Sequence, residues 1–343
     1  MNLLRRWKTP AVAEELFHRD PGSEIHRPLA VDFSAAGGFS FVDSCNFRGG
    51  VVYYLHDEIS VYHKRKAMAM EKNLRRDPVI GFLDSGIGGL TVLYEARQRC
   101  PNARYLYYAD TDHVPYGTKS REEIRRYVVD AVTFLVKHGV DILVIACNTA
   151  TSMAVEELRS RFPLPIIGME PAVRPAILRY PGARILVCAT PATIHGEKLH
   201  HLLDVHHADP STTILIPTPR LVTYAEAGEF APEVIVPYLR EVIPPDKYAA
   251  CVLGCTHFTL FRDSFTVCLG SDTVCIDGNT GTVNRMCDVL RENGFAKDAD
   301  TAQNGCKTDG GGTVRYYLSG REVAEPKTLQ FYQTIFDRMA ALS

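Results

Sequence analysis

An apolar run that ends in a cysteine is the feature that most constrains how this chain can fold. Residues 142–152 read ILVIACNTATS, so a run of large aliphatic side chains leads to Cys147 and then to small polar residues. Such a run, followed by a helical pattern at Met153–Arg161, is typical of a buried strand in a parallel sheet. Because α/β sheets bind ligands at the C-terminal ends of their strands, Cys147 is a candidate reactive thiol. The alternative is a buried structural cysteine.

The same arrangement occurs a second time. The apolar residues 249–254 lead into Cys255, and both halves follow the order turn, helix, strand, helix and a strand that ends in a cysteine. This internal similarity predicts an α/β fold with two pseudo-symmetric lobes, each a mostly parallel sheet flanked by helices. We expect the active site in the cleft between the lobes.

Lobe boundaries follow from this rhythm of strands and helices. The first lobe is predicted at residues 78–172 and is completed by residues 281–343, which contain a predicted strand at Thr313–Leu318. The second lobe is predicted at residues 173–280. Residues 1–77 lack the rhythm, which predicts either a poorly ordered N-terminal extension or a mis-assigned start of translation.

Composition narrows the classes of function. The formal net charge is −2, which gives no basic footprint for nucleic acid. No apolar run reaches the ~18 residues of a membrane span. Ten cysteines in a chain without an export signal indicate reduced thiols. The sequence has no Cys-x-x-Cys pair, the spacing that would indicate a zinc site. We therefore expect small-molecule chemistry, with neither nucleic acid nor a membrane as a partner.

A pair of thiols at equivalent strand ends suits one reaction in particular. Inversion of a carbon centre needs two proton carriers, one that removes a proton from one face and one that delivers a proton to the other. Thiols can do both, because helix N-termini and nearby charges shift a thiol pKa from its ordinary value near ~8.5.

The ordered motifs resemble those of the glutamate racemase family, within the wider aspartate/glutamate racemase superfamily. They read DSGIGGLT from Asp84, PYG from Pro115, ACNTA from Ala146 and LGCTH from Leu253. The resemblance covers the chain from about Pro78 onward.

This resemblance implies a two-base interconversion of L- and D-glutamate without pyridoxal phosphate, metal or any other cofactor. It also implies a bacterial cytoplasmic enzyme that supplies D-glutamate for peptidoglycan. Members of the family differ in whether they form a homodimer and in whether a cell-wall precursor activates them, and both questions are open for this chain.

The resemblance also assigns roles to residues. Cys147 is similar to the family cysteine that deprotonates D-glutamate, and Cys255 to the one that deprotonates L-glutamate. Asp84 and His257 match the groups that orient each thiol or take its proton; for Asp84 the alternative is a helix cap. Together with Asp84 and His257, the implied substrate contacts are Ser85, Pro115, Tyr116, Gly117, Asn148, Thr149, Thr193, Glu226 and Thr256.

The chain departs from the family pattern in two places. Thr218 precedes Pro219 where the family commonly has Cys-Pro, and Gly278 follows Asp277 where the family has Asp-Ser. Both changes concern the surroundings of the two cysteines and not the cysteines themselves.

Three alternative functions stay open at this point. Spacing does not reveal the length of the substrate side chain, so an aspartate racemase is the nearest alternative. An amide hydrolase with one catalytic cysteine would not need Cys255. A binding or regulatory protein that keeps the fold would exchange no α-proton.

Overall fold

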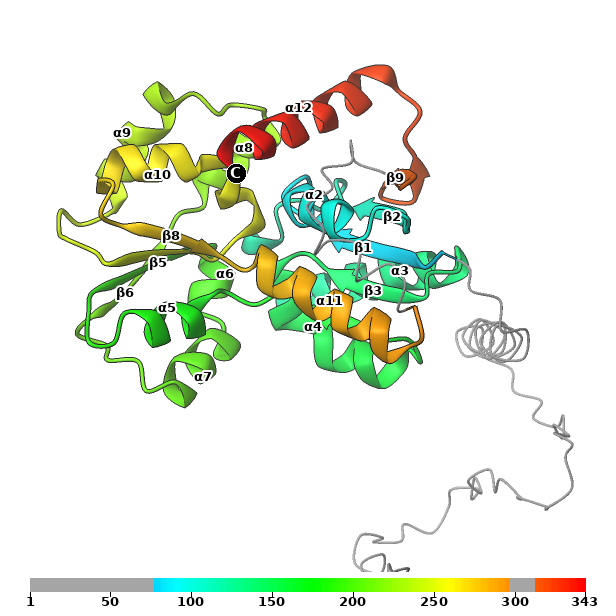
Figure 1. Cartoon of the computed structure of the whole chain (residues 1–343), viewed down its shortest axis with the longest axis horizontal. Helices are drawn as coiled ribbons and strands as arrows, with labels where there is room; N and C mark the ends of the chain where they lie inside the picture. Colours follow the sequence, from blue (N-terminus) through cyan, green and yellow to red (C-terminus); the bar gives the residue numbers. More distant parts are fainter. Residues whose placement is uncertain (1–76, 296–311) are drawn as a thin grey trace, which may run out of the picture. The chain divides into compact units, whose positions relative to one another are not determined.

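The computed structural model describes residues 77–295 and 312–343, which all belong to one compact unit (Figure 1). Within these residues the strands form a six-stranded and a four-stranded sheet. The predicted extension at residues 1–77 lies outside the described residues, apart from Asp77.

The larger sheet has the strand order β10-β9-β2-β1-β3-β4. Neighbouring strands in this sheet run parallel, except that β9 and β10 form an antiparallel hairpin. The central strand β1 is buried along its whole length, as expected for a parallel sheet that is covered on both faces. The strands are β1 (Val79–Asp84), β2 (Arg104–Ala109), β3 (Ile142–Ile145), β4 (Ile166–Gly168), β9 (Val314–Leu318) and β10 (Arg321–Glu322).

The smaller sheet has the order β6-β5-β7-β8, and all its neighbours are parallel. This order repeats the β2-β1-β3-β4 order of the larger sheet, so the two cysteine-bearing strands β3 and β7 occupy equivalent places. The strands are β5 (Ile185–Ala189), β6 (Thr213–Pro217), β7 (Ala250–Leu253) and β8 (Val274–Asp277). The prediction of an α/β fold with mostly parallel sheets flanked by helices is confirmed.

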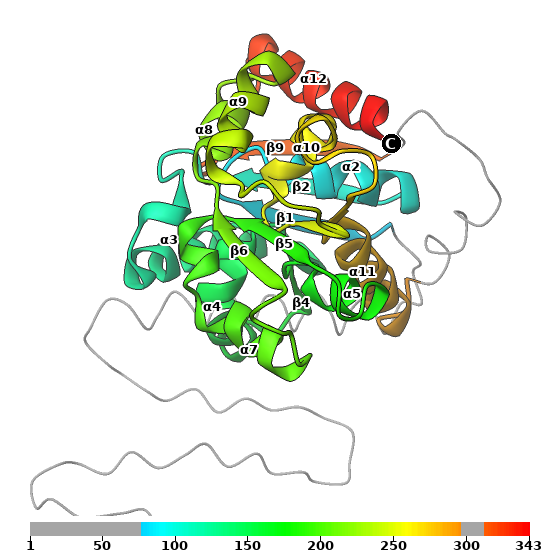
Figure 2. The same ribbon diagram turned by 90° about the vertical axis from the view of Figure 1, so that its left-hand side faces the viewer.

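Helices cover both faces of each sheet. Along β1, Ile80 and Phe82 face one apolar core with α2 and α11, whereas Val79 and Leu83 face another with α3 and α4. Figure 2 shows α8, α9, α10 and α12 on one side of the sheets and α4, α5 and α7 on the other. The helices are α2 (Leu90–Arg99), α3 (Arg121–Lys137), α4 (Asn148–Arg161), α5 (Val173–Arg179), α6 (Pro191–Ile194), α7 (Glu197–Val205), α8 (Arg220–Glu226), α9 (Pro232–Val242), α10 (Arg262–Leu269), α11 (Asn279–Glu292) and α12 (Pro326–Leu342), with short 3₁₀ turns η1 (Tyr116–Thr118) and η2 (Thr256–Phe261).

Local sequence explains these elements. Helix α3, for example, begins with a capping box in which Ser120 and Glu123 satisfy each other's backbone N–H groups. Ile124, Val128 and Leu135 then recur at helical spacing, and all three are fully buried.

The C-terminal segment joins both halves of the fold. The strand predicted at Thr313–Leu318 is β9, which pairs with β2 in the larger sheet. Helix α12 packs on α2 and also reaches the smaller sheet's half, where Arg338 Nε donates to Leu260 O at 2.6 Å and pairs with Asp263.

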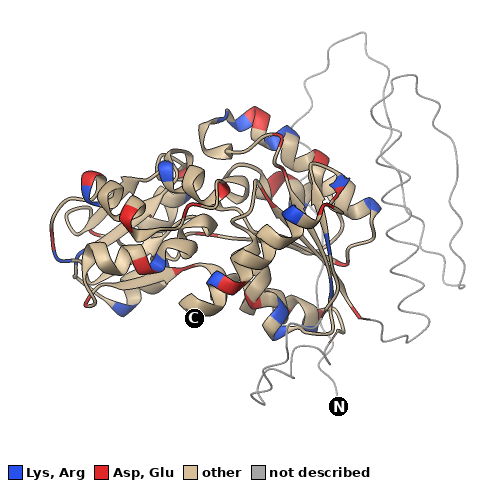
Figure 3. Ribbon diagram, turned by 90° about the horizontal axis from the view of Figure 1, so that it is seen from above, with Lys and Arg blue, Asp and Glu red and all other residues tan. Residues whose placement is uncertain are grey.

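Charged residues of both signs are interspersed over the described elements (Figure 3). In the described parts of the chain, no helix combines the length and the apolar character needed to cross a membrane.

Candidate active site

Cys147 lies at the point where β3 gives way to a helix. The strand ends at Ile145 and α4 begins at Asn148, so Cys147 is the N-cap residue of α4. The sequence predicted a helix start at Met153, because the intervening small polar residues are poor helix formers. The earlier start places the thiol directly at the positive end of the helix dipole.

The contacts of the Cys147 thiol have opposing effects on its pKa. Sγ accepts the Ala150 N–H at 3.4 Å, and the thiol contacts Ser85 Oγ at 3.9 Å. Burial, and then the charge of Asp84, raise the pKa of Cys147 above its ordinary value, while the Ala150 N–H lowers it. The net effect is a raised pKa, so the resting thiol carries its proton.

Asp84 ends β1 and is fully buried. Its Oδ2 accepts the N–H of Gly86 at 3.1 Å and that of Gly89 at 3.0 Å, so the carboxylate organises the turn after β1. The N-cap residue of α2 is Gly89, which means that Asp84 is not a helix cap. Burial raises the pKa of Asp84, and the nearby His257 partly opposes this effect.

Two glycines of this turn leave room for residues that belong to the smaller sheet's side of the site. A Cβ added at Gly86 would collide with Glu226 Oε1. A Cβ at Gly88 would collide with Thr256 Oγ1 and lie 2.5 Å from His257 Nδ1. The Gly-rich turn is therefore explained by close packing across the site.

The second thiol stands at the start of a polar chain. Cys255 Sγ lies 3.5 Å from His257 Nδ1, and His257 Nε2 lies 2.6 Å from Glu226 Oε1. Glu226, the last residue of α8, also accepts the N–H of Ile87 at 2.9 Å. Burial lowers the pKa of His257, but its hydrogen bonds to Cys255 and Glu226 and their charges outweigh burial and raise it well above its ordinary value.

The two thiols belong to one electrostatic site. Charge on Cys255 contributes to the raised pKa of Cys147, and His257 acts on the pKa of Asp84. Cys147 and Asp84 therefore both respond to charged groups that follow β7 of the smaller sheet.

A cluster of buried threonines crosses the site. Thr149 Oγ1, at the start of α4, lies 3.1 Å from Thr190 Oγ1 and 3.3 Å from Thr193 Oγ1. Thr190 and Thr193 are 3.1 Å apart. Sequence reasoning did not place Thr190 among the site residues, although it follows β5 where Asp84 ends the equivalent strand β1.

Some buried polar atoms at the site have no protein partner. Among the described residues, both amide atoms of Asn148 and Oδ1 of Asp84 are buried without a hydrogen bond. Such groups are rare in folded proteins and point to a polar ligand. An amide that can both donate and accept suits the carboxylate and ammonium of an amino acid.

The predicted PYG residues form a loop after β2. Tyr116 is buried and its hydroxyl donates to Asp110, to which sequence reasoning gave no role in the site. Pro115 precedes it, and the Pro115 carbonyl accepts from Thr118 Oγ1 at 3.2 Å. Gly117 packs against Thr190, since a Cβ at this glycine would lie 3.1 Å from Thr190 Cβ.

The two departures from the family pattern have different surroundings. The Thr218 hydroxyl is fully buried and has no hydrogen-bond partner in the described part of the chain. At Gly278 a Cβ would lie 2.7 Å from Glu170 O and 3.0 Å from Met169 Cε, so the backbone after β4 leaves room only for glycine.

The structure thus brings most of the predicted site residues to one place. The hydrogen bonds and close contacts at this place involve Asp84, Ser85, Tyr116, Gly117, Cys147, Thr149, Thr193, Glu226, Cys255, Thr256 and His257.

Two related α/β sheets that place a pair of thiols in one buried polar site define an enzyme suited to proton transfer at carbon. The family model for Asp/Glu/Hydantoin racemase matches residues 91–286. A glutamate racemase from Halothermothrix orenii is 44% identical over 71% of this chain and 93% of that relative. The chain therefore belongs to the Asp/Glu/hydantoin racemase family, among the glutamate racemases, as the motifs predicted.

Solved structures agree with this assignment. The Escherichia coli glutamate racemase, in complex with L-glutamate and the activator UDP-MurNAc-Ala, matches with a TM-score of 0.61 and 26% identity over 73% of this chain and 100% of that one. The Francisella tularensis glutamate racemase, in complex with D-glutamate, matches with a TM-score of 0.61 and 25% identity over 77% of this chain and 95% of that one.

Proposed function

We propose that this racemase interconverts L- and D-glutamate by moving the α-proton between Cys147 and Cys255. One observation carries the proposal: the two buried thiols follow the equivalent strands β3 and β7, close enough that the charge of Cys255 acts on Cys147. A chain with a single catalytic cysteine would leave the second thiol and its His257–Glu226 partners without a task.

The proton transfers balance as follows. The Cys255 thiolate takes the α-proton of L-glutamate and becomes a thiol. The Cys147 thiol gives its proton to the opposite face of the carbanion and becomes a thiolate. The reverse reaction starts from this second state. The raised pKa of Cys147 fits both duties, because its thiol is protonated at rest and its thiolate is a strong base.

The neighbours of each thiol prepare it for these steps. His257 is held by Glu226 and can exchange a proton with Cys255, whereas Asp84 is the buried carboxylate near Cys147. The charge that builds on the substrate carboxylate needs donors, and the N-terminus of α4 at Asn148 supplies N–H groups that suit it. We assign the remaining substrate contacts to Ser85, Pro115, Tyr116, Gly117, Thr149, Thr193 and Thr256.

The wider setting is part of the same proposal. D-glutamate made by this chain would serve peptidoglycan synthesis in a bacterial cytoplasm. Because the E. coli relative was solved with UDP-MurNAc-Ala as an activator, a cell-wall precursor is the effector to test first. A homodimer, and lobes at residues 78–172 with 281–343 and at 173–280, stay predictions.

The experiment is circular dichroism of D-glutamate with the purified full-length chain and no added cofactor. We expect the signal to decay to zero, and L-glutamate to approach the same end point from the opposite sign. D-aspartate under the same conditions is the control for substrate length. A steady D-glutamate signal, or decay with D-aspartate alone, would contradict the proposal.

A further inference from the structure

We propose that Asp110 is a positioning residue of the glutamate site, which acts by holding the Tyr116 loop in place together with a serine from the C-terminal hairpin. The inference rests on the proposed function and deepens it. It concerns a buried carboxylate outside the family motifs that the sequence singled out.

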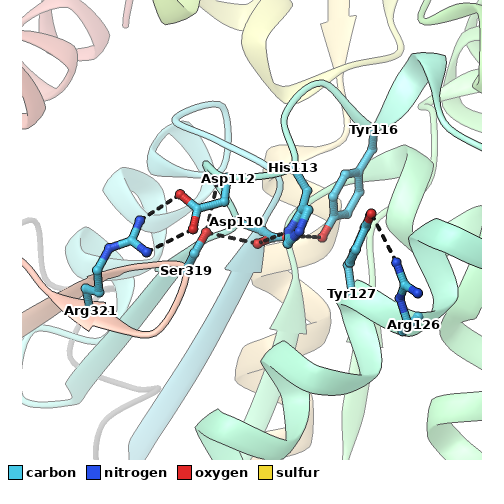
Figure 4. A network of polar contacts seen from close by, with 8 residues as sticks. All are labelled: Asp110, Asp112, His113, Tyr116, Arg126, Tyr127, Ser319 and Arg321. Atoms are coloured by element: carbon cyan, nitrogen blue, oxygen red, sulfur yellow. Dashed lines mark hydrogen bonds and ion pairs between the residues drawn. The ribbon is translucent and has the colours of Figure 1, made fainter.

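Asp110 directly follows β2 and is only 2% exposed. The Tyr116 hydroxyl donates to its Oδ2 at 2.6 Å, and the Ser319 hydroxyl donates to its Oδ1 at 3.0 Å (Figure 4). His113 Nδ1 lies 2.9 Å from each oxygen. A carboxylate accepts at both oxygens, so Asp110 can take all of these donors at once.

The directions of the hydrogen bonds are fixed by chemistry. The backbone N–H of Asp112 donates to Ser319 Oγ at 3.0 Å, so the Ser319 hydroxyl proton is left to point at Asp110. The proton of Tyr116 also goes to Asp110, and burial followed by the Asp110 charge raises the Tyr116 pKa, which keeps the phenol a donor. Both hydroxyls are thereby locked in one orientation.

The serine comes from a distant part of the chain. Ser319 is the first of the two turn residues between β9 and β10, it has a positive φ of 44°, and it lies 209 positions from Asp110. Its N–H donates to Ala109 O at 2.8 Å, which fastens the turn to the end of β2. On the outer side, Arg321 and Asp112 form a bidentate ion pair at 2.6 and 2.9 Å (Figure 4).

The far side of the same loop meets the threonine cluster. Gly117 packs on Thr190, which contacts Thr149 and Thr193. The loop Tyr116–Thr118 is therefore held between Asp110 on one side and Thr190 on the other. Loosening the Asp110 contacts should let the loop move away from glutamate without altering either thiol.

The test uses Asp110→Asn in the full-length protein, with wild type measured in parallel. The asparagine amide must turn its NH₂ group toward either Tyr116 or Ser319. That NH₂ group then faces a hydroxyl that donates its proton in the wild type, so one hydrogen bond is lost. We expect KM for both enantiomers to rise about ten-fold, as expected for the loss of a hydrogen bond to a charged group, with kcat changed less than about three-fold. Glu322→Gln is the matched control, because it removes an exposed carboxylate of the same hairpin that pairs with Arg315.

A double-mutant cycle with Tyr116→Phe shows whether Asp110 acts through the tyrosine. In the Tyr116→Phe background, Asp110→Asn should raise KM by less than about two-fold. Fully additive effects, or an unchanged KM in Asp110→Asn, would overturn the inference. Failure of the wild type to racemise glutamate would instead count against the proposed function.

Ser319→Ala covers the case in which Asp110→Asn does not fold. It removes one donor and leaves the carboxylate, so KM should rise about three-fold with a cooperative thermal transition retained. An unchanged KM in both Ser319→Ala and Tyr116→Phe would also overturn the inference.

Discussion

Glu226 holds one ring nitrogen of His257 at 2.6 Å, and the other ring nitrogen lies 3.5 Å from Cys255 Sγ. The same glutamate oxygen accepts the N–H of Ile87 from the turn after β1. The orientation of the second thiol's partner therefore depends on how closely the two sheets' halves approach each other.

Replacing Glu226 with glutamine tests this chain of contacts. The Glu226 charge raises the pKa of His257, so Glu226→Gln should let the imidazole lose its proton at a lower pH. The alkaline limb of kcat/KM should shift to lower pH, with kcat/KM near neutrality reduced about ten- to hundred-fold. Racemisation rates between about pH 6 and 9 measure the shift. Glu241→Gln is the control, since Glu241 is exposed and pairs with Arg220 of α8; an unmoved alkaline limb in Glu226→Gln would contradict the role of the pair.

Separate serine variants of the two cysteines test the division of labour. Cys147→Ser and Cys255→Ser should each lose racemisation by at least about 10³-fold, because each lacks one of the two proton carriers. In deuterated water, Cys147→Ser should exchange the α-proton of L-glutamate faster than that of D-glutamate, and Cys255→Ser should show the opposite preference. NMR of the α-proton follows the exchange. Full racemisation by both variants would rule out the two-thiol mechanism.

Asp84→Asn should trade activity for stability. Because the folded pKa of Asp84 is raised, its favourable contribution is complete below the ordinary Asp pKa and is lost as pH rises through the folded value. Near neutral pH the free energy of unfolding of Asp84→Asn should therefore be about 0.5–2 kcal/mol higher than that of the wild type. The rate of racemisation should fall more than about 100-fold.

Urea unfolding at several pH values measures this difference. The stability gain of Asp84→Asn should disappear below about pH 4, where both states of the wild type carry the proton. Asp288→Asn, which changes a half-buried residue of α11 that pairs with Arg291, serves as the control and should stay within about 0.5 kcal/mol. A loss of stability in Asp84→Asn at neutral pH would contradict the assignment.

A pair of glycine substitutions separates close packing from chain flexibility. Gly88→Ala places a Cβ against Thr256 and 2.5 Å from His257 Nδ1, so it should destabilise the fold by about 1–3 kcal/mol and lower kcat/KM. Gly281→Ala in α11 meets nothing within 4 Å and should instead stabilise by about 0.5–1 kcal/mol with unchanged activity. Thermal unfolding measures the change in stability of each variant, and racemisation rates measure the change in activity. Equal effects of the two substitutions would argue against the packing explanation.

Sequence alone predicted the two cysteine-bearing strands, β3 and β7, because their apolar runs are continuous and end in polar residues. It placed the start of α4 too late, since helix propensity is weak over residues 148–152 and the Cys147 cap and tertiary packing decide the start. The pairing of Glu226 with His257 and that of Asp110 with Ser319 were not readable. Each joins residues on separate elements, and only the packing of those elements brings the side chains together.

The unlike neighbours of the two thiols have a thermodynamic consequence. Asp84 and Ser85 accompany Cys147, whereas His257 and Glu226 accompany Cys255. Mirror-image substrates have equal free energies in water, so detailed balance requires the same kcat/KM in both directions for the wild type and for every variant. The unequal surroundings can make the two kcat values differ only if the two KM values differ by the same factor. The unequal surroundings of the two thiols therefore determine which enantiomer predominates on the enzyme at saturation. The direction of net conversion depends instead on which enantiomer the next reaction consumes.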